Sequence, residues 1–181
     1  GLGPTLEFYS VISKEFQKKS LKMWRGSLDN LTDSSYVMYQ NGLFPAPMSN
    51  VMQSGAIGKK ILSLFKMLGK LVGRSLLDGR LVDFAFNEVF FQIAGLIDEA
   101  GAVEYDGAIR SVLFDRLRVV DKDLASSLQY LQKFIDEYEE NATLYAYPDQ
   151  VKVDGATLED LSLSFVLPGY PDFELVDGGA D

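Results

Sequence analysis

Two residue types are missing from this chain: its 181 residues include no cysteine and no histidine. Without them there is no thiol nucleophile, no Ser-His-Asp triad, no zinc site with the usual ligands and no cysteine-ligated iron–sulfur cluster. The lack of cysteine also excludes a disulfide framework, which favours an intracellular location, cytoplasmic or nuclear. We therefore expect no metal site and no cofactor within the chain.

Long apolar runs and an excess of positive charge are missing as well. No apolar stretch reaches the length of a membrane span and no signal-peptide pattern is present, so we expect no membrane partner. Lys and Arg number 17 against 26 Asp and Glu, which gives a formal net charge of −9. This charge disfavours contact with phosphate backbones, and we expect no nucleic-acid partner.

The chain does have ample material for a core, with 47% hydrophobic and 12% aromatic residues. Apolar residues recur at helical spacing in several segments, which predicts a mainly α-helical domain. Gly69 and Gly73, four residues apart in the clearest of these segments, are expected to let a neighbouring helix pack closely. The predicted helices cover residues 4–19, 57–77, 87–100, 108–118 and 123–140, and Asp121 is expected to cap the last of them.

Shorter segments have the signals of strands and turns. Residues 36–39 are predicted as a short strand, followed by a turn at Asn41–Gly42. Near the end, apolar and serine residues alternate over residues 161–165, the period of a half-buried strand. The sequence PGYP then predicts a turn and residues 173–176 a returning strand. The expected fold class is therefore α+β, mainly α-helical, with short β-hairpins.

Three stretches together resemble one family: GLGPTLEFYSVISKEFQ at the start, FKMLGKLVGRSLLDGRLVDFAFNEVFF in the middle, and LEDLSLSFVLPGYPDFELVDGG at the end. They are similar to the larger, N-terminal lobe of HECT-type ubiquitin ligases. The stretches GLGPTLEFY and LPGYPDFEL are most similar to sequences of the ubiquitin-fusion-degradation and thyroid-receptor-interactor branch of that family. The likeness runs through nearly the whole chain in the same order.

The resemblance implies a role in the ubiquitin conjugation pathway, leading to proteasomal degradation. In this family the larger lobe docks a ubiquitin-conjugating enzyme charged with ubiquitin, which passes to a cysteine in a C-terminal lobe and then to a substrate lysine. That lobe is expected outside this chain, which should be inactive alone, and substrates are expected to bind other parts of the parent protein. The implied domains are residues 1–120, the main helical part, and residues 121–181, a partial subdomain that docks the conjugating enzyme.

The resemblance also implies which residues dock the conjugating enzyme. They form an apolar groove between a helix and a strand, and they are Leu124, Ser127, Leu128, Leu131, Leu161 and Leu163. The four helix positions share one face by their spacing. Taken without the resemblance, the same leucine stripe is typical of ordinary core packing, and the alternation of Leu161 and Leu163 is typical of any half-buried strand.

Two further hypotheses belong to other classes. A helical scaffold that binds proteins without any transferase role fits the composition equally well. A hydrolase that uses paired carboxylates, such as Asp121 with Asp123 or Glu159 with Asp160, is the third. These pairs fall where helix caps and turns are expected, which favours a structural role for them.

Overall fold

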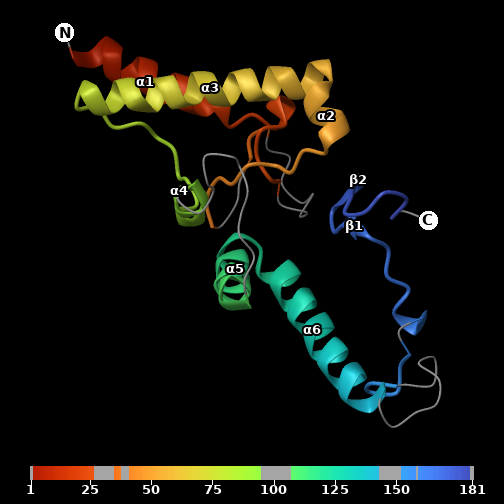
Figure 1. Cartoon of the computed structure of the whole chain (residues 1–181). Helices are drawn as coiled ribbons and strands as arrows, with labels where there is room; N and C mark the ends of the chain where they lie inside the picture. The colour runs from red at the N-terminus through yellow and green to blue at the C-terminus, as the bar shows by residue number, and fades with distance from the viewer. Residues whose placement is uncertain are drawn as a thin grey trace. The chain divides into compact units, whose positions relative to one another are not determined.

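Helices dominate the computed structural model of the chain, which confirms the mainly α-helical α+β class (Figure 1). The chain divides into two units, unit 1 over Gly1–Val103 and unit 2 over Glu104–Asp181. None of the described helices is both long and apolar enough to cross a membrane. The structure describes residues 2–26, 35–37, 41–94, 107–142, 152–157 and 159–179.

Unit 1 is built around the long helix α3, which runs beside α1 in Figure 1. The sequence predicted α1 and α3 to within a few residues, whereas only the first half of the predicted helix 87–100 falls on described residues. The described elements of unit 1 are α1 (Leu2–Phe16), a 3-10 turn η1 (Lys19–Leu21), α2 (Asn50–Ser54), α3 (Ala56–Leu77) and α4 (Glu88–Ala94).

The core of unit 1 centres on Trp24, which is buried with Phe16, Met23, Ile61 and Leu68. Its ring packs edge-on against those of Phe65, Phe90 and, at a tilt, Phe86, with centroids 5.2, 6.5 and 6.0 Å away. The indole Nε1 donates a 2.7 Å hydrogen bond to the carbonyl of Phe16. Because a buried indole N–H needs an acceptor, this bond fixes Trp24 against the end of α1.

A second long-range link joins the Asn41–Gly42 turn to the start of α4. The backbone N–H of Leu43 donates to the carbonyl of Ala85 at 2.7 Å, and that of Asn87 donates to the carbonyl of Leu43 at 3.0 Å. Gly42 has a φ of +86° and lies so close to this segment that a Cβ would be 2.7 Å from the Ala85 oxygen. The predicted turn is therefore confirmed, while most of the predicted strand 36–39 lies outside the described residues.

The two glycines of α3 do not have the expected role. A Cβ placed on Gly69 or Gly73 meets nothing within 4 Å, and both positions are exposed. The prediction that they let a neighbouring helix pack closely is therefore wrong within the part of the chain that the structure describes. The buried side of α3 lies elsewhere, at Ile61, Leu68 and Ser75.

The described residues of unit 2 form two α-helices followed by a small hairpin. The extensive contacts between its described elements are those of α5 with α6 and of β1 with β2. Strands β1 and β2 are antiparallel and form a two-stranded sheet. The elements are α5 (Gly107–Val120), α6 (Lys122–Ala142), a 3-10 turn η3 (Glu159–Leu161), β1 (Val166–Leu167) and β2 (Tyr170–Glu174).

The strand predicted over residues 161–165 is not present. Leu161 ends the 3-10 turn η3, and Ser162 has a left-handed φ of +46°, which breaks an extended chain. Pairing begins only at Val166, and the chain turns at Pro168–Gly169 as predicted. The returning strand β2 overlaps the predicted one but begins three residues earlier. The site residues Leu161 and Leu163 therefore lie outside any strand.

Candidate functional site

The start of α6 is fixed by the cap that the sequence predicted. The Asp121 carboxylate accepts a 2.9 Å hydrogen bond from the backbone N–H of Leu124, which is otherwise without a partner in the first turn of a helix. A carboxylate at this position is also favoured by the helix dipole. Asp121 therefore caps α6, which is the structural role that the sequence predicted for it.

An apolar stripe follows from this cap along one face of α6. Leu124 is buried, Leu128 and Leu131 are half-buried, and Ile135, the next residue at helical spacing, is 45% exposed. Other described residues therefore bury the start of this stripe more fully than its end. We call Leu124, Leu128, Leu131 and Ile135 the α6 apolar stripe.

Ser127 lies at the edge of this stripe and is exposed. Its hydroxyl donates a 3.0 Å hydrogen bond to the carbonyl of Asp123, one turn earlier. The structure thus brings all four predicted helix residues onto one face of α6. Ile135 was missed because the family motif ends at Leu131, although its position four residues later is the signal that predicts it.

Leu161 and Leu163 lie on a separate segment. Leu161 is half-buried in η3, and Leu163, which follows it, is 52% exposed. The turn before Leu161 is held by reciprocal bonds: the carboxylate of Asp160 accepts from the N–H of Thr157 at 2.8 Å, and the Thr157 hydroxyl accepts from the N–H of Asp160 at 3.3 Å. The backbone hydrogen bond from Thr157 is the main cause that lowers the pKa of Asp160.

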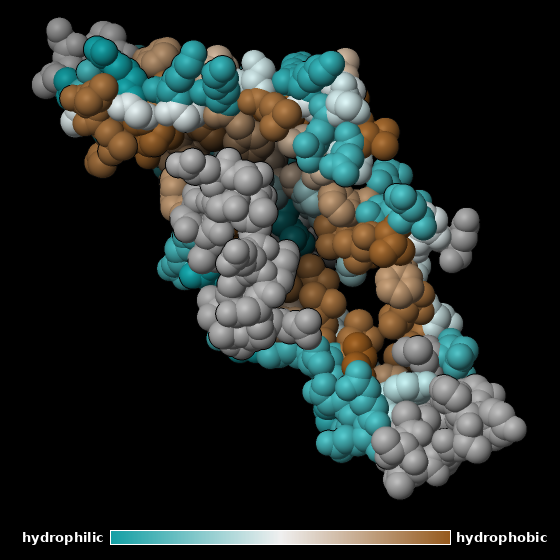
Figure 2. Space-filling view, in the orientation of Figure 1, coloured by the Kyte–Doolittle hydropathy of each residue, from teal (hydrophilic) through white to brown (hydrophobic). Residues whose placement is uncertain are grey.

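The opposite flank of α6 is polar, and Figure 2 shows hydrophilic side chains over the lower half of this helix. An open cleft of about 370 Å³ lies between α5 and α6, lined by Phe114, Asp115, Gln129, Gln132, Lys133 and Asp136.

Polar groups of this flank pair with one another. Gln132 donates to Asp136 at 2.8 Å, and Lys133 lies 3.3 Å from Glu137, a hydrogen bond that raises the pKa of the lysine. No group of Asp and Glu side chains among the described residues is arranged to hold a metal ion. Four of the polar side chains that line the cleft, Asp115, Gln132, Lys133 and Asp136, therefore already have a partner on their own helix.

The sequence of the chain matches one protein family over nearly its whole length. The HECT-domain (ubiquitin-transferase) family matches residues 10–181, nearly the entire chain. The chain belongs to the HECT family. The α6 apolar stripe and the hairpin therefore lie within the matched part of a HECT domain.

Several curated relatives match over the full extent of the HECT chain. Ubiquitin fusion degradation protein 4 of Saccharomyces cerevisiae is 37% identical over 188 residues, covering 100% of this chain and 11% of that protein. A probable ubiquitin fusion degradation protein of Schizosaccharomyces pombe is 39% identical, covering 99% and 9%. E3 ubiquitin-protein ligase TRIP12 of Danio rerio is 32% identical, covering 100% and 9%. The HECT chain spans about a tenth of the length of these relatives.

Proposed function

We propose that this chain is the part of a HECT ubiquitin ligase that docks a ubiquitin-conjugating enzyme. The observation that carries the proposal is the α6 apolar stripe, whose far end the described residues leave uncovered. Half-buried and exposed leucine and isoleucine side chains of this kind form the centre of protein interfaces, where a few apolar contacts supply most of the affinity. Membership of the HECT family supports the assignment of a ubiquitin-conjugating enzyme as the partner of this surface.

The docked partner brings the ubiquitin thioester. In the reaction that we propose for the parent protein, a cysteine thiolate outside this chain attacks the thioester carbonyl and the conjugating enzyme's thiolate leaves. Ubiquitin then passes from that cysteine to the amine of a substrate lysine, marking the substrate for degradation. The role of this chain is to position the two thiols, and no step uses one of its side chains as a nucleophile.

Leu163 is proposed as a second contact for the same partner. It is more exposed than Leu124, Leu128 and Leu131 of the helix, and it follows directly on the left-handed Ser162. An exposed leucine at this position gains apolar contact when a partner covers it. The proposed surface thus consists of the α6 apolar stripe, Ser127, Leu161 and Leu163.

The test is the binding of purified ubiquitin-conjugating enzymes to the Leu128→Asp variant. A carboxylate in the middle of the stripe would have to be buried at the interface, so we expect affinity to fall by about tenfold or more. Ser126→Asp, on the opposite, exposed face of α6, is the matched control and should bind normally. Circular dichroism checks that both variants retain their helices.

Leu163→Asp separates a binding effect from a folding effect, because this side chain already contacts water. It should weaken binding while leaving the stability of the chain unchanged. Folded Leu128→Asp and Leu163→Asp variants that bind every conjugating enzyme as tightly as the unmodified chain would contradict the proposed site.

A further inference from the structure

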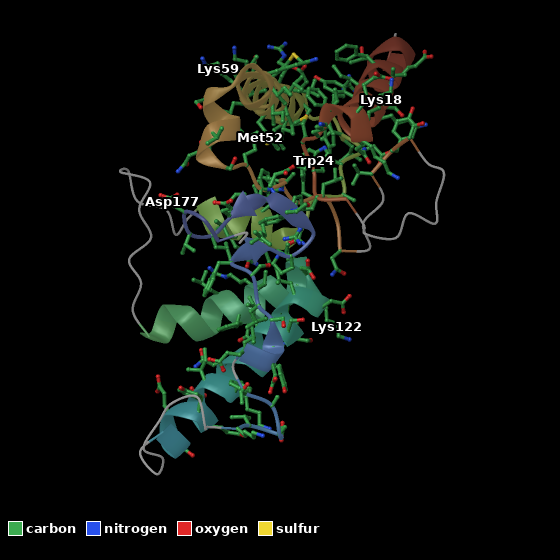
Figure 3. The ribbon with its side chains drawn as sticks, turned by 90° about the vertical axis from the view of Figure 1, so that its right-hand side faces the viewer. Lys18, Trp24, Met52, Lys59, Lys122 and Asp177 are labelled. Carbon is green, nitrogen blue, oxygen red and sulfur yellow. The ribbon has the colours of Figure 1, made fainter. Side chains whose placement is uncertain are left out.

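The outer side of α3 in unit 1 is strongly basic. The 22 residues of α3 include five Lys and Arg side chains and no Asp or Glu, in a chain whose net charge is −9. Lys59, Lys66 and Lys70 are spaced by seven and four residues, so they form a row along one side of the helix. Figure 3 places Lys59 at the outer edge of unit 1, on the opposite side of α3 from Trp24.

These charges are not neutralised within the described structure. Arg74 pairs with Asp78 at 3.0 Å, whereas none of the described acidic residues forms an ion pair with the lysines of α3. All of these lysines are exposed. Lys59, Lys66 and Lys70 therefore form a row of positive charge, unpaired within the described residues, in unit 1, whose residues 1–103 contain 11 Lys and Arg against 9 Asp and Glu.

Exposed apolar side chains lie beside this lysine row. Leu62 is 48% exposed and Leu76 is 75% exposed, and the next residue, Leu77, is also exposed. Leu62 and Leu76 are separated by four helical turns, on the flank of the helix next to Lys66. In Figure 2 hydrophobic and hydrophilic side chains both line the edge of unit 1 that α3 forms. We call Leu62, Lys66, Lys70, Leu76 and Leu77 the α3 outer strip.

We propose that the α3 outer strip docks an acidic amphipathic helix of a partner protein. Exposed leucines toward either end of a row of lysines match a helix that has leucine or alanine on one face and carboxylates at its margin, the pattern by which helices pair in register. The apolar contacts would supply affinity. The lysines would select carboxylates and speed association.

Charge distinguishes this occupant from the others that a basic helix suggests. Symmetric pairing with α3 of a second copy would place lysine beside lysine, which opposes association. A membrane surface requires the most apolar side of the helix, and in α3 that side is buried at Ile61 and Leu68. The phosphate backbone of a nucleic acid would leave the exposed Leu62, Leu76 and Leu77 without an apolar partner.

The experiment uses the full chain and two synthetic helical peptides. Both have leucine and alanine on one face, and the flanking positions are glutamate in one peptide and lysine in the other. Fluorescence anisotropy of the labelled peptides measures the two affinities. We expect the glutamate peptide to bind, to bind less tightly as salt is raised, and to exceed the lysine peptide in affinity by about tenfold or more.

Charge reversal then locates the binding surface. The double variant Lys66→Glu/Lys70→Glu should weaken binding of the glutamate peptide about tenfold, since each reversal replaces an attraction with a repulsion. Lys14→Glu/Lys19→Glu makes the same change in net charge at exposed positions of unit 1 outside α3 and should leave binding unchanged. Leu76→Ala tests the apolar part and should also weaken binding.

Three results would overturn the proposal. The first is equal binding of the two peptides, which would indicate apolar adhesion without charge selection. The second is a dimer in sedimentation that Lys66→Glu/Lys70→Glu abolishes, which would make a second copy the occupant. The third is binding of anionic vesicles or DNA, but not of the glutamate peptide, with the same sensitivity to the two reversals.

Discussion

The two units differ in how their residues are held together. Unit 1 has a central aromatic residue, Trp24, that joins distant parts of the sequence, and backbone hydrogen bonds link the Gly42 turn to the start of α4. In unit 2 the described contacts are mostly local: a capped helix, a short turn and a hairpin. Both units leave large apolar side chains exposed, among them Leu76 in unit 1 and Leu163 in unit 2. The difference is therefore one of contact range, because unit 1 depends on residues far apart in the sequence and unit 2 on neighbouring ones.

The largest effect is expected from Trp24→Ala in unit 1. Removing the indole leaves a cavity among Phe65, Phe86 and Phe90 and an unpaired carbonyl at Phe16, so unfolding should be easier by about 3–5 kcal/mol. Denaturant titration followed by circular dichroism measures this change. Trp24→Phe, which keeps a ring and loses the hydrogen bond, should cost less. A loss below about 1 kcal/mol for Trp24→Ala would show that the core does not depend on this residue.

Gly42→Ala tests the long-range backbone link of unit 1. The added Cβ would collide with the Ala85 oxygen while the residue keeps a left-handed φ, so we expect a loss of about 2 kcal/mol or more. Gly79→Ala is a matched control, because Gly79 also has a positive φ of +62° but open space around its Cβ. It should cost about 1 kcal/mol. Equal losses in thermal unfolding would show that the contact with Ala85 is unimportant.

Asp121→Ala should have a smaller effect, since it removes the side-chain cap of a single helix of unit 2. Losing the cap leaves the N–H of Leu124 without its side-chain acceptor, and stability should fall by about 1 kcal/mol. Asp121→Asn keeps an acceptor oxygen and should be nearly neutral. Amide hydrogen exchange in the first turn of α6 reports the loss directly. Unchanged exchange in Asp121→Ala would show that the turn forms without the cap.

The smallest effect is a loosening of the Thr157–Asp160 turn in acid. Its hydrogen bonds lower the pKa of Asp160 below the ordinary value of 3.8. The carboxylate therefore stabilises the turn fully above pH 3.8, and this contribution is lost as the pH falls through the lowered pKa. The amide NMR signal of Thr157 should shift over that range, and Asp160→Asn should abolish the shift. A midpoint at or above the ordinary value would contradict the lowered pKa.

Most helices were predictable from the sequence because their determinants are local. Periodicity gave α3, α5 and α6, and the cap at Asp121 was identified from its residue type and position. The strand over residues 161–165 was predicted wrongly because alternation cannot reveal that Ser162 is left-handed. The exposure of Gly69 could not be predicted either, because spacing within one helix does not show what packs against it.

The candidate site was predictable in part for the same reason. Helical spacing placed the four predicted residues of α6 on one face, and the structure agrees. The graded exposure that ends at Ile135 depends on which other segments cover the stripe, and a local pattern does not contain that information. Docking by these residues stays a prediction until binding is measured.

The position of Trp24 also has a spectroscopic consequence. The chain contains one tryptophan, and it is buried in unit 1, so intrinsic emission reports on the state of that unit while unit 2 contributes no indole signal. Far-ultraviolet circular dichroism follows the helices of both units. Coincident melting curves by the two methods would mean that the units unfold cooperatively, and separated curves would reveal an intermediate with one unit still folded.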